Sequence, residues 1–420
     1  MGRGSVCQVR ESCGSRTTIL REVRRWAAVN QMPVESDGIS LARSVTEHVR
    51  LTGKHFLPDR VLGQLSDIRH RHAADRPFLH AFLDCVLDKH EGRFWNRTYL
   101  ALPVLELLME ERHSALSADR MSVMLMSDVV RFEIEAAGGS RAGSGRGRPD
   151  PARLGTRLRH ALRFVAKGLG RAEAGALPSR MAHMPRARLE ELVEHLPRPP
   201  ATDGFRWFDV TVQPVYVLHD EYFFIRVLQA HEMLFTAIAA DMEEAIRELR
   251  AGDPEGGVQR IDHAVAMFER AAALFRIVAT MQPEQFSDFR QYTEGASAIQ
   301  SEQYKRFESL CGVPTVPRLC SSAFTSVPAV KAEVEDDRHD TVSQAYLDLR
   351  AEGRFGPGEW HRLDAALSRL ENGHQRWKSA HRSIAVRMLG DAHGSGHTTG
   401  VPYLTECLDN RLFWQLDTRH

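Results

Sequence analysis

The stretch that indicates the fold most strongly is residues 221–250, EYFFIRVLQAHEMLFTAIAADMEEAIRELR. Apolar side chains and one histidine recur there every three or four residues, which places them on one face of a helix. They are Phe224, Val227, Leu228, His231, Leu234, Phe235, Ile238, Met242 and Ile246. Residues 258–281 and 360–373 repeat this spacing, and Gly252-Asp253-Pro254 separates the first two stretches. With few strand signatures elsewhere, these patterns predict an all-α fold.

The rest of the chain divides by composition. Helical patterns cover about 45–137 and 157–195, whereas 138–155 is rich in Gly, Arg, Ser and Pro. We expect a disordered N-terminus over 1–40, a helical N-terminal region over 41–137, a flexible linker over 138–156, a helical connector over 157–200 and one domain over 201–420. Residues 312–340 carry three prolines and no period, so we expect a wrapping loop there. The N-terminal region is either a helical scaffold or a docking domain for a partner.

Lysine plus arginine and aspartate plus glutamate both number 55 in 420 residues. No net charge therefore draws the chain to nucleic acid, to an anionic membrane or to an acidic partner. The six cysteines are scattered without a C-x-x-C pair, which favours a reduced compartment. No apolar run approaches the ~20 residues of a membrane span, and the first residues lack a hydrophobic signal. We expect a cytoplasmic protein that binds neither membrane nor nucleic acid.

One histidine stands in a helical stretch near the C-terminal end. Residues 377–390 read WKSAHRSIAVRMLG and place His381 on the same side as Trp377. A neutral imidazole on a packed helix suits axial ligation of heme iron, because the helix fixes the ring and an apolar wall excludes water. A core histidine with its own hydrogen bonds is the alternative. Residues 391–400, DAHGSGHTTG, follow as a glycine-rich loop whose backbone and hydroxyls can approach a charged ligand closely.

The order of these two segments resembles the heme-ligand segment of the tryptophan 2,3-dioxygenases, whose loop usually reads Gly-Thr-Gly-Gly-Ser-Ser-Gly. The resemblance implies that His381 is the axial ligand of heme b. It also implies that Ser395 stands where the family has a threonine that contacts the amino-acid end of the substrate. His393 and His397 are unusual in this loop, and either neighbour the heme propionates or the substrate, or face water.

A second pair of segments matches the same family in the same order. Residues 281–290, MQPEQFSDFR, and 297–308, SAIQSEQYKRFE, resemble the family's Phe-Arg and Ser-Gly-Phe-Gln-Ser-x-Gln-Tyr-Arg-x-Ile-Glu pair. This implies that Arg290 binds the substrate carboxylate, for which a planar guanidinium is suited, and that Ser297 lies by the heme pocket. An ion pair with Glu294 is the alternative for Arg290.

The third match is residues 219–225, HDEYFFI, followed by a glutamine at 229, a glutamate at 232 and a phenylalanine at 235. It resembles the family's His-Asp-Glu-x-Leu-Phe-Ile-x-x-His-Gln-x-x-Glu-Leu-Trp, and the resemblance implies that Phe224 is an aromatic wall of the substrate pocket. Asp220 and Glu221 also suit an ordinary helix start, where acids meet the positive end of the helix dipole.

The chain departs from the family at two positions of the substrate pocket. Leu228 stands where the dioxygenases have a distal histidine that hydrogen-bonds the indole N–H, and Phe286 stands where they have a tyrosine. The indoleamine branch of the superfamily also lacks the distal histidine, so dioxygen insertion does not require it. His231, on roughly the same helix face as Leu228, either offers a polar group in its place or is a core histidine bonded to a backbone carbonyl.

The resemblance implies a helical-bundle heme domain of tryptophan-dioxygenase type over 201–420, with an additional helical N-terminal region. We expect a homo-oligomeric enzyme of tryptophan catabolism, in the kynurenine pathway. It would use heme b and dioxygen to oxygenate the indole ring of L-tryptophan, giving N-formylkynurenine, or the ring of a tryptophan derivative. Two alternatives stay open: a specialised-metabolism heme enzyme that acts on a modified tryptophan or tyrosine, and a non-catalytic protein that binds heme or an indole.

Overall fold

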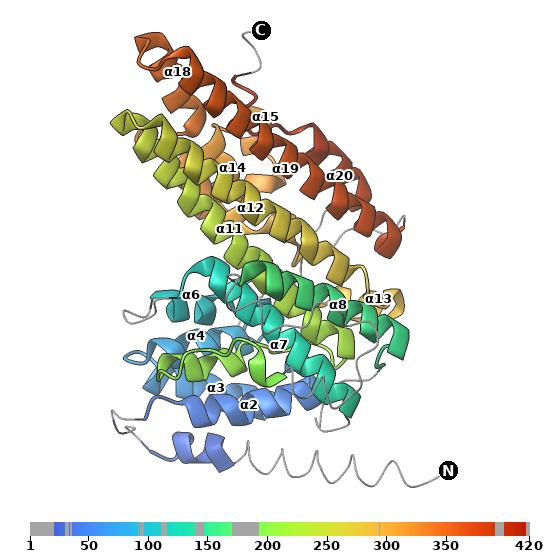
Figure 1. Ribbon diagram of the computed structural model, residues 1–420. Coiled ribbons are helices and arrows are strands. Elements are labelled where there is room, and N and C mark those ends of the chain that lie inside the picture. The colour runs from blue at the N-terminus through green and yellow to red at the C-terminus, as the bar shows by residue number, and fades with distance from the viewer. Residues whose placement is uncertain are drawn as a thin grey trace. The chain divides into compact units, whose positions relative to one another are not determined.

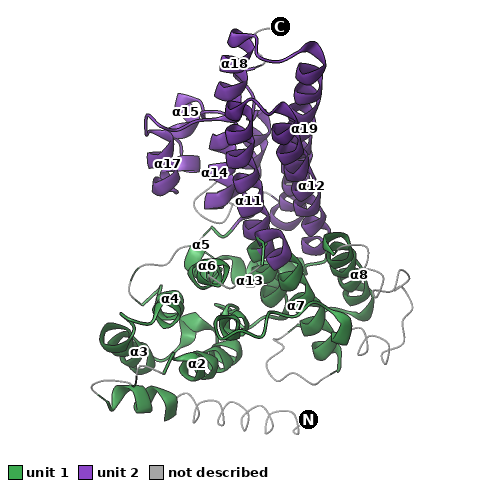
Figure 2. Ribbon diagram, turned by 60° about the vertical axis from the view of Figure 1, so that its left-hand side comes forward, with its two compact units in different colours: residues 1–117, 123–229, 280–296 green, residues 118–122, 230–279, 297–420 purple. Residues whose placement is uncertain are grey.

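The computed structural model describes residues 21–29, 33, 36–90, 92, 96–110, 116–138, 147–169, 193–293, 295–390 and 399–416. Every regular element within these ranges is a helix, which confirms the all-α prediction (Figure 1). The chain forms two compact units, coloured separately in Figure 2. Unit 1 comprises residues 1–117, 123–229 and 280–296, and unit 2 comprises residues 118–122, 230–279 and 297–420.

Unit 1 packs helices around buried aromatic side chains. Trp207, in η2 (Gly204–Val210), stacks on Phe78 of α4 (Pro77–Val86) with ring centroids 5.6 Å apart. Its α8 (Pro151–Gly168) begins with a proline, and the Asp150 carboxylate caps it by accepting two backbone N–H groups. The unit also contains α2 (Ile39–Thr52), η1 (Lys54–Phe56), α3 (Asp59–His72), α5 (Asn96–Tyr99), α6 (Leu102–Glu110), most of α7 (Ala118–Gly138), the start of α11 (His219–Ala251) and α13 (Pro283–Arg290).

Unit 2 is built on two long helices that lie side by side, α12 (Pro254–Val278) and α19 (Pro357–Leu389) (Figures 1 and 2). Trp377 of α19 is buried and meets Phe275 of α12 and Phe235 of α11 with ring centroids 5.5 and 5.3 Å apart. The unit also contains η3 (Ala298–Gln300), α14 (Glu302–Cys311), α15 (Val316–Leu319), α16 (Ser322–Thr325), α17 (Pro328–Val334), α18 (Val342–Glu352), α20 (Val401–Glu406) and η4 (Cys407–Asp409).

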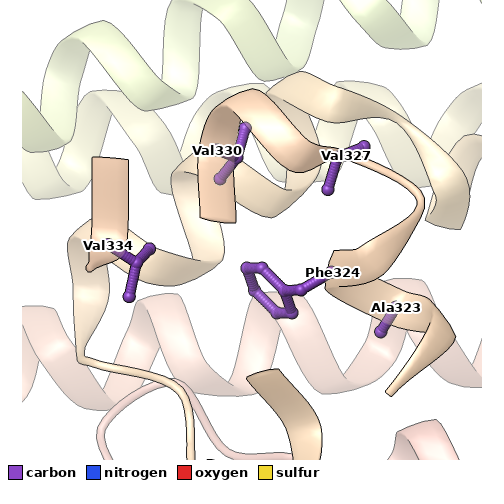
Figure 3. Packing of buried hydrophobic residues seen from close by; sticks show 5 residues of the cluster. All are labelled: Ala323, Phe324, Val327, Val330 and Val334. Atoms are coloured by element: carbon purple, nitrogen blue, oxygen red, sulfur yellow. The ribbon is translucent and has the colours of Figure 1, made fainter. Parts of the chain in front are cut away.

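Residues 312–340 differ from the wrapping loop that the sequence predicted. They form α15, α16 and α17, because Pro317 and Pro328 each occupy the first turn of a short helix, where a missing N–H costs nothing. Phe324 of α16 fills the centre of a small apolar cluster with four neighbours (Figure 3). Those neighbours are Ala323, Val327, Val330 and Val334.

The long helices lie where the sequence patterns predicted them, and one of them ends later than predicted. The stretch 221–250 lies within α11, whose most apolar window is 83% buried, as in the core helix of a soluble protein. The helix predicted over 360–373 continues to Leu389 as α19. Gly373 does not end it, because a glycine inside a helix costs only about 1 kcal/mol relative to alanine and the buried side chains on either side of it hold the helix.

Candidate functional site

His381 lies on α19 and packs against two aromatic rings of unit 2. Its imidazole stacks on Phe275, with ring centroids 5.2 Å apart and an interplanar angle of 14°, and lies 5.6 Å from the Trp377 indole. Ser297 Oγ lies 3.4 Å from His381 Nε2, and Nδ1 has no hydrogen-bond partner among the described residues. Burial lowers the pKa of His381 to about 3, so its imidazole is neutral at pH 7.

These features fit an axial ligand of heme iron. Iron binds the neutral imidazole and not the imidazolium. The stacked phenyl ring and the indole hold the plane of the imidazole, and the side chain is half-buried. Because the contact between Nε2 and the Ser297 hydroxyl is long, the Nε2 lone pair is not committed to a strong hydrogen bond.

His231 belongs to the same aromatic cluster of unit 2. Its ring lies 5.1 Å from the Phe275 ring and 6.2 Å from the Trp377 indole, and its side chain is buried. A positive charge on His231 would lower the pKa of His381 further. His231 is therefore a neighbour of His381 within the cluster.

An aromatic cluster in unit 1 contains two of the residues that the sequence placed at the substrate. Phe224 of α11 lies 5.6 Å from Phe286 and 5.4 Å from Phe289, both on α13. Leu228, one turn beyond Phe224, is buried as well. None of these four side chains carries a hydrogen-bonding group. The cluster suits contact with an aromatic ring and supplies no partner to an indole N–H.

Arg290 lies on the same α13 face as Phe286, one helical turn later. Desolvation lowers the pKa of its guanidinium, although an arginine remains protonated at neutral pH. Its alternative partner Glu294 lies outside the described residues, as do Ser395, His393 and His397. The structure thus brings Phe224 to Phe286 within unit 1 and Ser297 to His381 within unit 2, and each pair is a feature of its own unit.

The His-Asp-Glu motif at 219–221 is buried in unit 1 and binds two residues that the sequence did not reveal. His219 Nε2 lies 2.8 Å from Glu133 Oε2, and Arg157 donates to Asp220 Oδ1 at 2.8 Å. Glu221 accepts two backbone N–H groups of the preceding turn, and burial raises its pKa to about 8. Glu133 and Arg157 lie 86 and 63 residues before their partners, so no local pattern connects them.

A family model described as Tryptophan 2,3-dioxygenase matches residues 210–332. Curated proteins with the same name match about half of the chain. The one from Polaromonas naphthalenivorans is 25% identical over 242 residues, which cover 49% of this chain and 86% of that protein. Those from Burkholderia mallei and Bacillus anthracis are each 24% identical, over 47% and 48% of this chain and over 75% and 85% of their own length.

The chain is a divergent member of the tryptophan 2,3-dioxygenase superfamily.

The match to the superfamily model covers the aromatic cluster of unit 1, Arg290 and Ser297, but neither His381 nor Ser395. Glu133 and Arg157 also lie outside it. The all-α fold is the one expected for this superfamily. Leu228 and Phe286 lie within the matched range, and neither side chain carries a hydrogen-bonding group.

Proposed function

We propose that this superfamily member is a heme-dependent oxygenase that inserts both atoms of dioxygen into the indole ring of L-tryptophan or of a tryptophan derivative. The single observation that supports this most directly is the neutral imidazole of His381, stacked on Phe275 in a chain whose relatives are named tryptophan 2,3-dioxygenase. Heme b bound through His381 would supply the redox-active iron that dioxygen chemistry needs.

The residues of this chain bind and orient the substrate. Arg290 receives the substrate carboxylate through two parallel hydrogen bonds, a geometry that a guanidinium provides. Phe224 and Phe286 pack against the indole and exclude water from it. Leu228 provides no base, so the reaction proceeds without a proton transfer at that position. Both oxygen atoms enter the product as the C2–C3 bond of the indole breaks, which gives N-formylkynurenine from tryptophan.

Two hydroxyl groups complete the proposed site. Ser297 lies by the heme pocket, as its 3.4 Å contact with His381 Nε2 suggests. Ser395, in the glycine-rich loop, contacts the amino-acid end of the substrate, a role that rests on the resemblance alone.

An absorption spectrum of the purified protein tests heme ligation. We expect a Soret band after reconstitution with hemin and its loss in His381→Ala. The matched control is His263→Ala, which removes a half-exposed histidine of α12 that pairs with Asp241. Full heme retention by His381→Ala contradicts the proposal. Mass spectrometry of the turnover product then tests the reaction, with a gain of two oxygen atoms on L-tryptophan expected.

The apolar wall favours one second candidate. Because Leu228 and Phe286 offer no hydrogen bond to the indole N–H, the substrate would be a modified tryptophan or a tyrosine of specialised metabolism. Turnover of a substituted analogue, with L-tryptophan left unchanged, supports this candidate. Tight tryptophan binding to the ferrous protein without any product would instead indicate a non-catalytic binding protein.

We also propose that the enzyme is cytoplasmic and homo-oligomeric. Cys85, Cys311, Cys320 and Cys407 are all unpaired thiols in the described part of the chain, which suits a reducing compartment. Light scattering of the purified protein tests the oligomeric state.

A further inference from the structure

Arg157, on α8, is the centre of a buried hydrogen-bond network in unit 1. Its guanidinium donates from Nη1 to Glu133 Oε1 at 2.6 Å and from Nη2 to Asp220 Oδ1 at 2.8 Å. Nε donates to Thr280 Oγ1 at 3.0 Å, and Nη2 also donates to the Thr280 carbonyl at 3.1 Å. The guanidinium carbon lies 3.8 Å from the centroid of the Phe223 ring. One fully buried side chain thus joins α7, α8, the start of α11 and the residues just before α13.

The network continues from Asp220 into the first turn of α13. Asp220 Oδ2 accepts the backbone N–H of Gln282 at 2.7 Å, and Gln282 is the N-cap residue of α13. In return, the backbone N–H of Asp220 donates to Gln285 Oε1 at 3.0 Å. Together with the contacts of Arg157 to Thr280, these bonds hold the chain at residues 280, 282 and 285.

The held segment leads directly to the residues proposed to bind substrate. α13 has only eight residues, and so short a helix does not form stably by itself in water. Its direction therefore depends on the contacts that hold it, which include the hydrogen bonds of its first turn and the packing of Phe286 and Phe289 on Phe224. Phe286 and Arg290 lie one turn apart on this helix, so a change at residues 280–282 displaces both side chains.

The network also pairs opposite charges. Arg157 places one positive charge between the carboxylates of Glu133 and Asp220, and His219 adds a hydrogen bond to Glu133. Burial works against ionisation of Glu133, yet the hydrogen bond of His219 and the charge of Arg157 outweigh it and lower the pKa of Glu133. A lysine at 157 would keep the positive charge, but an ammonium group cannot reproduce the planar fork of donors.

We propose that Arg157 and Glu133 are positioning residues for α13, which fix Arg290 where it receives the carboxylate of an aromatic amino acid. The identity of the ligand as an aromatic amino acid rests on the proposed function, whereas the hydrogen bonds of Arg157 and Glu133 do not depend on it. Both residues precede residues 210–332, the range that the family model matches. The N-terminal half thereby helps to position a substrate-binding residue, which is a role beyond that of a scaffold or a docking domain.

The test compares two variants of the 420-residue chain with a matched control. Arg157→Lys and Thr280→Val each remove hydrogen bonds between α8 and residue 280 without changing the charge of the network. The control is Arg226→Lys, which alters another fully buried arginine of unit 1. Its hydrogen bonds go to α7, to α11 and to residues 208–211, not to residues 280–290.

Two quantities are measured. The first is the dissociation constant for L-tryptophan and for tryptamine, which lacks the carboxylate. The second is the backbone hydrogen exchange of residues 282–290 under native conditions. In both variants we expect the L-tryptophan constant to rise on the order of tenfold and the tryptamine constant to rise by no more than about threefold, because both ligands lose packing against Phe286 but only L-tryptophan also loses the carboxylate contact with Arg290. We also expect faster exchange of 282–290. Arg226→Lys should lower the melting temperature without this discrimination between ligands.

The other possible results of these measurements also test the proposal. Equal weakening of both ligands indicates a general structural role and overturns the proposal, and so does an unchanged affinity for L-tryptophan. If the wild-type protein binds neither ligand, the proposed function fails. In that case the hydrogen exchange of residues 282–290 by itself tests whether Arg157 positions α13. Exchange in Arg157→Lys and Thr280→Val that is no faster than in the Arg226→Lys control would overturn the proposal.

Discussion

The Phe275 ring lies parallel to the His381 imidazole, and the same ring also contacts His231 on the neighbouring helix α11. A phenyl face forms no hydrogen bond of ordinary strength, so it restrains the imidazole by packing alone. His381 is consequently held in place although, among the described residues, Nδ1 has no hydrogen-bond partner and Nε2 has only the long contact with Ser297. Such a restraint orients a ligand without consuming its lone pair.

Shortening the Phe275 side chain should weaken heme binding. In Phe275→Leu the imidazole loses its stacked partner, and we expect the hemin dissociation constant to rise roughly tenfold, with a stability loss of about 1–2 kcal/mol. A hemin titration and a urea unfolding curve measure the two effects. Phe268→Leu is the control, because Phe268 meets Trp377 but not His381. Equal effects of both variants on hemin affinity would contradict the prediction.

Removing the Arg290 guanidinium should affect only ligands with a carboxylate. Charge-assisted hydrogen bonds contribute about 1.5–3 kcal/mol, so Arg290→Met should raise the L-tryptophan dissociation constant roughly 10- to 100-fold and leave tryptamine binding unchanged. Equilibrium titration measures both ligands. Arg276→Met, at an exposed position of α12, is the control. A similar loss for tryptamine would place Arg290 away from the carboxylate.

Methylation of the indole nitrogen should have little effect. Leu228 and its aromatic neighbours offer no partner to the indole N–H, so we expect kcat/KM for N1-methyl-L-tryptophan within about threefold of the value for L-tryptophan. Steady-state kinetics with both substrates measures this ratio. A preference for L-tryptophan above about tenfold, or 1.4 kcal/mol, would show that another group recognises the N–H.

The stability of the protein should fall at mildly acidic pH in a way that depends on His374. Burial lowers the pKa of His374 to about 4, and its Nε2 lies 2.7 Å from the hydroxyl of Tyr304. Below pH 6.5 the unfolded chain binds a proton at this residue that the folded chain does not bind until about pH 4. The contribution of the neutral His374 to the free energy of unfolding is therefore complete above pH 6.5 and is lost as the pH falls from about 6.5 to 4.

Urea unfolding at pH 7 and pH 5 measures this linkage. The wild-type protein should lose about 2 kcal/mol more than His374→Gln between the two values. His381, whose pKa burial also lowers, contributes with the same sign in both proteins and cancels in the comparison. Identical pH slopes for the two proteins would show that His374 is not buried in its neutral form.

Local patterns predicted the long helices well because their information is contained within a few turns. The spacing in 221–250 predicts α11, and the spacing in 258–281 predicts α12. The short helices at 316–334 escaped prediction, since their apolar residues form a cluster only after the chain folds around Phe324. The contacts of Glu133 and Arg157 escaped it as well, because they depend on the packing of α7 and α8 on α11. Of the neighbours of His381, Trp377 could be predicted because it lies one turn away on the same helix. Phe275 could not, because it comes from another helix.

The position of Trp377 gives the protein an internal optical probe. This indole is fully buried among aromatic rings and lies 5.6 Å from the His381 imidazole. Its fluorescence should be blue-shifted in the heme-free protein, because no water reaches the excited ring. A heme on His381 would accept the excitation energy of so near a donor and extinguish that emission. Heme binding and loss can therefore be followed in real time by intrinsic tryptophan fluorescence. The Trp377→Phe variant identifies the residue that responds.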